Sequence, residues 1–222
     1  MDQLSQNMPL YLLPGLGFDD RIYSKIDFGN HLVSAINWIE PAPNEPIAVY
    51  AGKMAAGIAE SEEVILIGHS FGGMMAQEIA ALRPVSRIIL LNSIKSRAEM
   101  PFFFKMAGPL GLYHLFTQSG TIRSLPLWGK QHGYESPEEV ELFTSMVRKH
   151  SNRYLQWALK SLSGWQGVNI PAETSLYQIN GRRDKTFPFS QIKTPDAVLD
   201  GGHFMVYKQP EVVGKRILAA IR

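Results

Sequence analysis

The stretch from Val64 to Gly73 constrains the fold more than any other part of this sequence. Its first four residues, Val64–Ile67, are apolar and predict a buried strand. A Gly-x-Ser-x-Gly spacing centred on Ser70 follows, and then Met74–Leu82, which is rich in helix-forming residues. A serine at the apex of a strand, sharp turn and helix is held in a strained conformation, and only glycine fits on either side of it. The stretch therefore predicts an exposed, reactive serine on an α/β fold.

Composition excludes several classes of function. The net charge of +2 and the lack of a Lys/Arg run argue against a nucleic-acid partner. There is no cysteine, so disulfides and thiol nucleophiles are excluded. The six histidines show no paired metal-binding spacing, and we expect neither a metal nor a cofactor. A chain of 222 residues is typical of one domain.

No targeting or membrane-spanning segment is expected. The first residues, Met1–Asn7, lack a basic region followed by an apolar run, so they do not resemble a signal peptide. No apolar run approaches the ~18–20 residues of a spanning helix. We therefore expect a soluble, cytoplasmic protein without a membrane span.

The first half of the chain alternates between strand and helix signals. The expected elements are a strand at 10–13 with a Pro14–Gly17 loop, a short helix capped by Asp19 or Asp20 and running to Ile26, a strand at 31–39, a helix at 47–60 and a strand at 87–92. Together with the central strand and helix, this order predicts a parallel sheet with helices on both faces.

From about residue 94 to 167 the strand signals stop. Aromatic and apolar residues crowd together here, a helix is expected from Ser136 to Lys149, and another from Asn152 to Ser161. We interpret this stretch as a helical insertion. Its aromatic side chains could simply pack against each other. An insertion that follows the carboxyl end of a strand also overhangs the crevice where such sheets bind ligands.

Three polar residues follow strands at the same expected edge of the sheet. Ser70 follows the central strand, Asp184 follows a strand at 174–180, and His203 follows a short strand at 197–199. Serine becomes a nucleophile when a base takes its proton, histidine is that base near neutral pH, and a carboxylate orients the imidazole. Asp196 and Asp200 are alternative carboxylates, although Asp200 precedes the histidine by only three residues. A helix at 210–221 ends the chain.

The sequence resembles the α/β-hydrolase superfamily in Leu13–Gly17, Gly68–Gly73, Gly181–Asp184 and Gly202–Phe204. The resemblance implies that Ser70 is the nucleophile, Asp184 the acid and His203 the base. It also implies an oxyanion hole made by the backbone N–H groups of Leu16 and Phe71.

The resemblance extends to the organisation of the chain. It implies one domain over residues 1–222, a mostly parallel six-stranded sheet that lacks the first strands of the fold, and a helical cap at about 94–167. The sequence departs from the family at Pro14, where a histidine is common, and at Pro41–Pro46, which replaces an Asp- and Gly-rich segment.

The expected function is cleavage of a carboxylic ester with an apolar acyl or alcohol group, through an acyl-enzyme. One alternative is a thioesterase or methyl esterase that acts on carrier-bound acyl chains. Basic residues of the insertion could meet an acidic carrier protein, or could form only a solvated face: Arg123, Lys130, Arg148, Lys149 and Arg153. Another alternative is a non-catalytic ligand-binding protein on the same fold. His69 is expected to support the site, and not to act as its base.

Overall fold

A six-stranded sheet in the order β2-β1-β3-β4-β5-β6 forms the centre of the computed structural model, which describes residues 8–58 and 63–222. All of its strand pairings are parallel. The strands are β1 (Leu10–Leu13), β2 (Val33–Ala35), β3 (Ile65–His69), β4 (Arg87–Leu91), β5 (Ser175–Gly181) and β6 (Ala197–Leu199). The predicted parallel α/β sheet of six strands is confirmed.

The central strands are buried on both faces. Every residue of β3 is buried, as a continuous apolar run in a parallel sheet requires. By contrast, β2 is an exposed edge strand and much shorter than the predicted strand at 31–39. The chain leaves the sheet after Ile36, whose N–H still donates to Leu12 O at 2.9 Å. Trp38 then packs over the loop after β1, where its Nε1 donates to Gly15 O at 3.0 Å.

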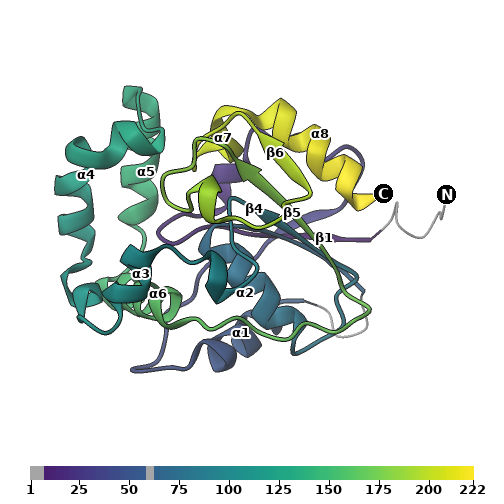
Figure 1. Cartoon of the computed structure of the whole chain (residues 1–222), viewed down its shortest axis with the longest axis horizontal. Coiled ribbons are helices and arrows are strands. Elements are labelled where there is room, and N and C mark those ends of the chain that lie inside the picture. The colour runs from purple at the N-terminus through teal and green to yellow at the C-terminus, as the bar shows by residue number, and fades with distance from the viewer. Residues whose placement is uncertain (1–7, 59–62) are drawn as a thin grey trace.

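Helices cover both faces of the sheet (Figure 1). Helices α1 (Ile47–Ala55) and α2 (Phe71–Ala80) lie on one face, and α7 (Met205–Lys208) and α8 (Pro210–Ile221) on the other. The expected end of α1 at Glu60 lies outside the described residues. The helix expected to run to Ile26 is a single 3-10 turn, η1 (Asp20–Tyr23), capped by Asp19. No helix within 8–58 and 63–222 is both long and apolar enough to cross a membrane.

A helical segment, residues 97–164, connects β4 to β5 and lies beyond the carboxyl ends of the strands (Figure 1). Local capping explains where its helices begin: Ser136 and Glu139 form a reciprocal capping box before one helix, and the Ser151 side chain accepts from Tyr154 N before another. The elements are η2 (Arg97–Glu99), α3 (Phe102–Ala107), η3 (Leu112–Leu115), α4 (Gln118–His132), α5 (Pro137–Val147) and α6 (Asn152–Gly164).

Asp19 connects the helical segment to the loop after β1. Its carboxylate accepts from Lys149 Nζ at 2.7 Å and from Arg21 Nη2 at 2.8 Å. Arg21 Nη1 in turn donates to Ser145 Oγ of α5 at 3.0 Å. Burial opposes ionisation of Asp19, but the hydrogen bonds from Arg21 and Lys149 outweigh it and lower the pKa of this carboxyl group.

Candidate active site

Ser70 occupies a strained turn between β3 and α2. Its φ of 54° and ψ of −121° are sparsely populated by residues with a side chain. The turn is held from both sides, because Ser70 N donates to Leu91 O at 3.0 Å and Ser93 Oγ donates to Ser70 O at 2.6 Å. The strain is therefore maintained by the end of β4, which presents Ser70 at the carboxyl edge of the sheet.

Glycines around Ser70 allow backbone segments to touch. A Cβ at Gly68 would lie 2.5 Å from the backbone of Gly73. A Cβ at Gly72 would overlap the carbonyl oxygens of Leu13 and Pro14. The loop after β1 therefore rests directly on the first turn of α2, close to Ser70.

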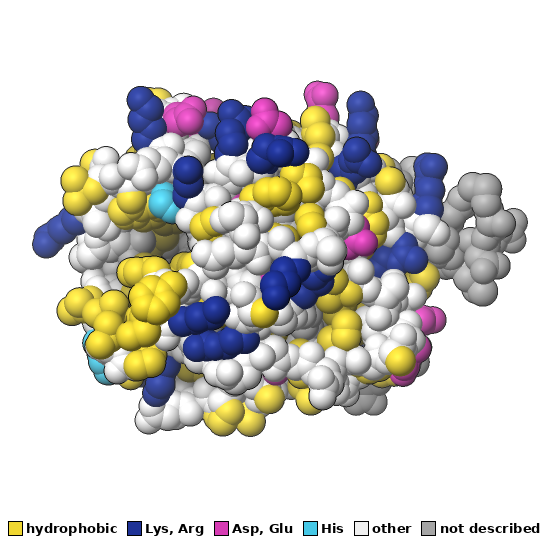
Figure 2. Space-filling model, viewed as in Figure 1, with side chains coloured by type: hydrophobic (Ala, Val, Ile, Leu, Met, Phe, Trp, Pro, Cys, Tyr) yellow, Lys and Arg dark blue, Asp and Glu magenta, His cyan; other side chains and the backbone are white. Residues whose placement is uncertain are grey.

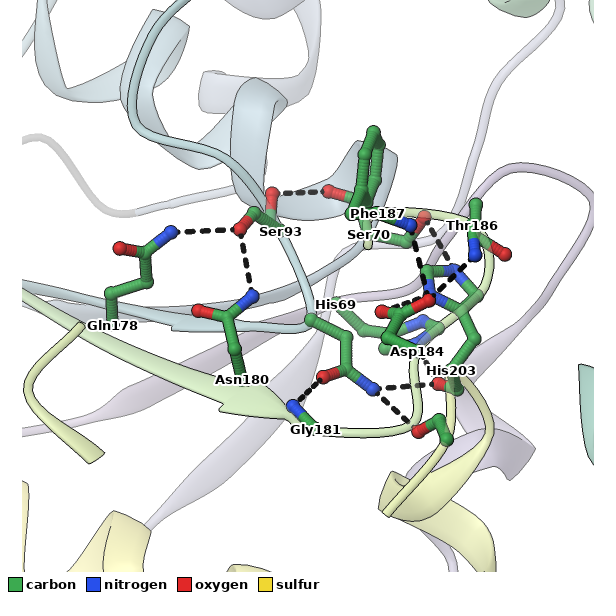
Figure 3. A network of polar contacts seen from close by, with 12 residues as sticks. His69, Ser70, Ser93, Gln178, Asn180, Gly181, Asp184, Thr186, Phe187 and His203 are labelled. Carbon is green, nitrogen blue, oxygen red and sulfur yellow. Dashed lines mark hydrogen bonds and ion pairs between the residues drawn. The ribbon is translucent and has the colours of Figure 1, made fainter. Parts of the chain in front are cut away.

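Three buried side chains meet at this edge (Figure 3). His203 Nε2 lies 3.0 Å from Ser70 Oγ, and His203 Nδ1 lies 2.8 Å from Asp184 Oδ2. The residues are 4%, 6% and 3% exposed for Ser70, His203 and Asp184 respectively. The structure thus brings together the three residues that the strand ends placed at one edge, in an arrangement able to move a proton from a hydroxyl to an imidazole.

Asp184 is fixed by the turn that follows β5. Its Oδ1 accepts from the backbone N–H groups of Thr186 at 2.7 Å and Phe187 at 3.1 Å, which leaves Oδ2 for the imidazole. The alternative carboxylates lie elsewhere. Asp200 is exposed and pairs with Arg183 at 3.1 Å, and Asp196 Oδ2 accepts from Gln178 N at 2.8 Å.

His69 supports the backbone of His203. Its Nε2 lies 2.9 Å from His203 O, and the ring is fully buried. Burial, together with the nearby His203, lowers the pKa of His69 well below 6.5, so the ring is neutral and donates through Nε2–H. This geometry agrees with the supporting position expected from the sequence.

Asn92 is a residue of the site that the sequence did not single out. It follows β4 with a φ of 46°, and its Nδ2 donates to Gly202 O at 2.8 Å and His203 O at 3.0 Å. Its Oδ1 accepts from Gly181 N at 2.6 Å. One amide therefore joins the ends of β4 and β5 to the loop that carries the imidazole.

A second layer of polar side chains lies behind Ser70. Ser93 O accepts from Gln178 Nε2 at 2.9 Å and from Asn180 Nδ2 at 3.3 Å (Figure 3). Both amides belong to β5 and are buried. The signal in the sequence for this network is the pair Gln178 and Asn180 within a buried strand, since buried polar groups require hydrogen-bond partners.

The two backbone N–H groups expected to form an oxyanion hole lie on the two segments that touch. Phe71 is the first residue of α2, and Leu16 lies in the loop that rests on that helix. Within the part of the chain that the structure describes, neither N–H donates to another protein group. Trp38 joins the two segments, because its ring stacks on Phe71 with centroids 5.3 Å apart while its Nε1 binds Gly15 O.

The helical segment reaches the site through aromatic side chains. Phe187 lies 5.9 Å from the His203 ring, and Phe104 of α3 lies 5.7 Å from Phe187, centroid to centroid. On the other side, Phe18 contacts His69 edge-on at 5.5 Å. The polar groups of the site are thus enclosed by apolar surface, which strengthens the hydrogen bonds among them.

The arrangement occurs on a known fold. A structure of Bacillus megaterium epoxide hydrolase in complex with an inhibitor is similar, with 13% identity, a TM-score of 0.72 and coverage of 97% of this chain and 93% of that chain. An esterase from Exiguobacterium antarcticum has 14% identity and a TM-score of 0.69, with coverage of 97% of this chain and 92% of that chain. MenH from S. aureus has 16% identity and a TM-score of 0.70, with coverage of 96% of this chain and 92% of that chain. At such identities the likeness concerns the fold. No curated protein sequence matches the chain.

The model of the Alpha/beta hydrolase family matches residues 10–216, which is nearly the whole chain and includes all the residues of the site described above. The match agrees with the parallel sheet, the strained serine turn and the order of the polar residues along the chain. This protein belongs to the alpha/beta hydrolase family.

Proposed function

We propose that this protein is a serine hydrolase that cleaves a carboxylic ester through an acyl-enzyme intermediate. The observation that carries the proposal is the pair of hydrogen bonds at His203, 3.0 Å to Ser70 Oγ and 2.8 Å to Asp184 Oδ2. A neutral imidazole held between a hydroxyl and a carboxylate can take the hydroxyl proton as the oxygen attacks.

The reaction follows from these positions. Ser70 Oγ attacks the ester carbonyl carbon while its proton passes to His203 Nε2. The tetrahedral intermediate collapses, the bond to the alcohol oxygen breaks, and the alcohol leaves with that proton. Water then attacks the acyl carbon as His203 takes one of its protons; the bond from that carbon to Ser70 Oγ breaks, His203 returns the proton to Oγ, and the acid is released. Asp184 holds the imidazole in the required tautomer throughout.

The negative oxygen of each intermediate needs donors that are already in place. We assign this role to the backbone N–H groups of Leu16 and Phe71. Phe71 begins the ten-residue helix α2, so the positive end of the helix dipole adds to the stabilisation. The strained turn at Ser70 places the nucleophile beside this helix end.

We assign the helical segment the role of a cap within a single domain. Phe104 and Phe187 form an apolar path from α3 to His203. Such a wall suits an apolar acyl or alcohol group. One of the similar structures is an esterase, which agrees with cleavage of an ester.

Thioesters are the second candidate substrates, because the same acyl-enzyme chemistry serves them. The basic residues first considered for an acidic carrier are only partly available. Lys149 is paired with Asp19 at 2.7 Å, and Arg153 with Glu40 at 3.4 Å. Lys130 lies instead in a cavity with other cations. That cavity favours an anionic group on the substrate.

Labelling by a fluorophosphonate probe tests the proposal, with turnover of 4-nitrophenyl esters of increasing chain length measured beside it. We expect wild-type protein to be labelled and active, and the folded Ser70→Ala variant to be neither. Wild-type protein that takes no label and cleaves no ester of the series would overturn the proposal and favour a ligand-binding protein.

A further inference from the structure

A cavity of about 510 Å³ lies beside the candidate active site. It is bounded by the end of α4, the turn after β5 and the start of α7. Figure 2 shows many Lys and Arg side chains on this face and a hollow at its left side. We call the space the basic cavity, because its charged lining is mostly cationic: Lys130, Arg182, Arg183, Lys185, Lys208 and the single carboxylate Glu135.

Some of these cations have protein partners. Arg183 pairs with Asp200 at 3.1 Å. Lys208 pairs with Glu135 at 3.1 Å and with Glu139 at 3.4 Å. These two side chains are therefore close to neutralised.

The remaining cations have no such compensation. Within residues 8–58 and 63–222, no carboxylate forms an ion pair with Lys130, Arg182 or Lys185. Three like charges around one concave space repel each other and raise its potential, so an anion that enters relieves the repulsion.

The cavity adjoins the residues assigned to catalysis. Gly202 and Phe204, on either side of His203, line it, and so do Arg183 and Lys185, on either side of Asp184. The wall between the cavity and the site is thus the imidazole and carboxylate segments themselves. None of Ser70, His203 and Asp184 lines the cavity, so a charged extension of a substrate bound at Ser70 would have to pass over these two segments to reach it.

We propose that the basic cavity binds an anionic part of the substrate, a phosphate or carboxylate group carried beyond the bond that is cleaved. The inference rests on the proposed function and specifies its substrate class. It favours thioesters and esters with charged leaving groups over wholly apolar ones. Both anions suit the same chemistry, since guanidinium and ammonium groups bind either.

A matched pair of thioesters tests the proposal on the full chain. Butyryl-coenzyme A and S-butyryl-N-acetylcysteamine share the bond that breaks, but only the first carries phosphates. We expect wild-type protein to show the higher kcat/KM with the coenzyme A ester, and this preference to shrink as NaCl is added. In Lys130→Gln/Arg182→Gln/Lys185→Gln we expect the ratio of the two kcat/KM values to fall by on the order of tenfold.

The ratio of the two kcat/KM values is the useful readout, because both substrates use the same Ser70, Asp184 and His203. If the change at Lys185 disturbs its neighbour Asp184, both kcat/KM values fall together and their ratio is unaffected. The matched control is Arg123→Gln/Lys215→Gln/Arg216→Gln, which removes three exposed cations outside the cavity. We expect it to keep the wild-type ratio. An equal fall in this control would mean that overall charge acts, and would overturn the proposal.

Direct binding separates this proposal from the proposed function. Calorimetry with inorganic pyrophosphate and with glutarate needs no turnover. We expect one or both to bind wild-type protein and to bind the cavity variant more weakly, and the tighter ligand tells phosphate from carboxylate. If neither binds, the cavity proposal fails while ester turnover stands. It fails likewise if pyrophosphate is the tighter ligand and wild-type protein shows no preference between the thioesters. Absence of all turnover and labelling, with pyrophosphate still bound, rejects only the hydrolase.

Discussion

The Nε2 nitrogen of His69 lies 2.9 Å from the backbone carbonyl oxygen of His203, and the two imidazole rings are 4.9 Å apart. Two rings so close cannot both carry charge at low cost. Burial and the neighbouring ring lower the pKa of His69 well below 6.5, so His69 remains a neutral donor. His69 therefore holds the backbone carbonyl of His203 without placing a second positive charge beside the His203 ring.

A test of this support compares His69→Leu with His69→Gln. Leucine removes the donor, and we expect kcat to fall by up to about tenfold with little change in KM, because one hydrogen bond contributes about 0.5–1.5 kcal/mol. The glutamine amide can reach the position of Nε2 and should restore part of the rate. Equal losses in both variants, with equal thermal stability, would show that His69 acts through packing alone.

Asp184 and Asp200 are distinguished by a pair of isosteric changes. We expect Asp184→Asn to lower kcat by on the order of 10⁴, because the amide favours the wrong tautomer of the imidazole. Asp200→Asn removes only an exposed pair with Arg183 and should retain activity within about twofold. Steady-state kinetics on one 4-nitrophenyl ester suffices, and the opposite ranking would move the acid to Asp200.

Much of the fold could be predicted because its signals are local. The continuous apolar run before Gly68 admits only a buried strand, and Ser70, Asp184 and His203 each follow a strand. Carboxyl ends of parallel strands meet at one edge, so order along the chain was enough to place these residues together. Their distances, however, depend on the turn at Asp184 and could only come from the structure.

Other features depend on contacts between distant segments. The predicted strand at 31–39 shrinks to Val33–Ala35 because Trp38 turns away to bind Gly15 O. Asn92 reads as an ordinary residue after a strand, yet it joins the ends of β4 and β5 to the loop that carries His203. The basic cavity joins the cations of the turn after β5 to Lys130 of α4 and Lys208 of α7, and no spacing along the sequence connects these three elements.

The backbone at Leu16 allows a test of the proposed oxyanion hole. Leu16→Ala keeps the N–H and should keep most of the activity, whereas Leu16→Pro removes the donor. Loss of one such donor costs roughly 10²–10³ in kcat, and we expect at least that. Thermal unfolding of both variants shows whether the loop survives. A folded Leu16→Pro variant with the wild-type rate would remove Leu16 from the hole.

Removal of the buried Tyr154 hydroxyl is expected to stabilise the protein. The residue is 1% exposed, and its oxygen makes no hydrogen bond of regular geometry to a described residue, the nearest backbone donor being the N–H of Gly17. An unpaired buried hydroxyl costs about 1–3 kcal/mol, so Tyr154→Phe should raise the free energy of unfolding. Tyr23→Phe is the matched control, because the Tyr23 hydroxyl donates to Leu13 O at 2.8 Å and its loss should destabilise. Urea unfolding measures both, and equal losses would mean that Tyr154 has a partner such as an ordered water.

The attachment of the helical segment should depend on pH through Asp19. Hydrogen bonds from Arg21 and Lys149 hold the pKa of Asp19 below its ordinary value of 3.8. A carboxyl group with a lowered pKa in the folded state stabilises the protein fully above its unfolded pKa, and this contribution disappears as the pH falls through the folded pKa.

Asp19→Asn keeps the acceptor that caps η1 but removes the charge. We therefore expect the variant to be less stable than wild type at pH 7, by on the order of 1 kcal/mol because both cations are partly exposed. The difference should shrink as the pH falls below 3.8 and disappear once the pH is below the folded pKa, and 1 M NaCl at pH 7 should narrow it. Asp20→Asn makes the same change of charge on an exposed neighbour without an ion pair to a described residue, and it should show no such pH dependence. Urea unfolding of the three proteins across this pH range decides the matter: a constant gap between wild type and Asp19→Asn from pH 7 to pH 3 would mean that the charge of Asp19 does not hold the helical segment in place.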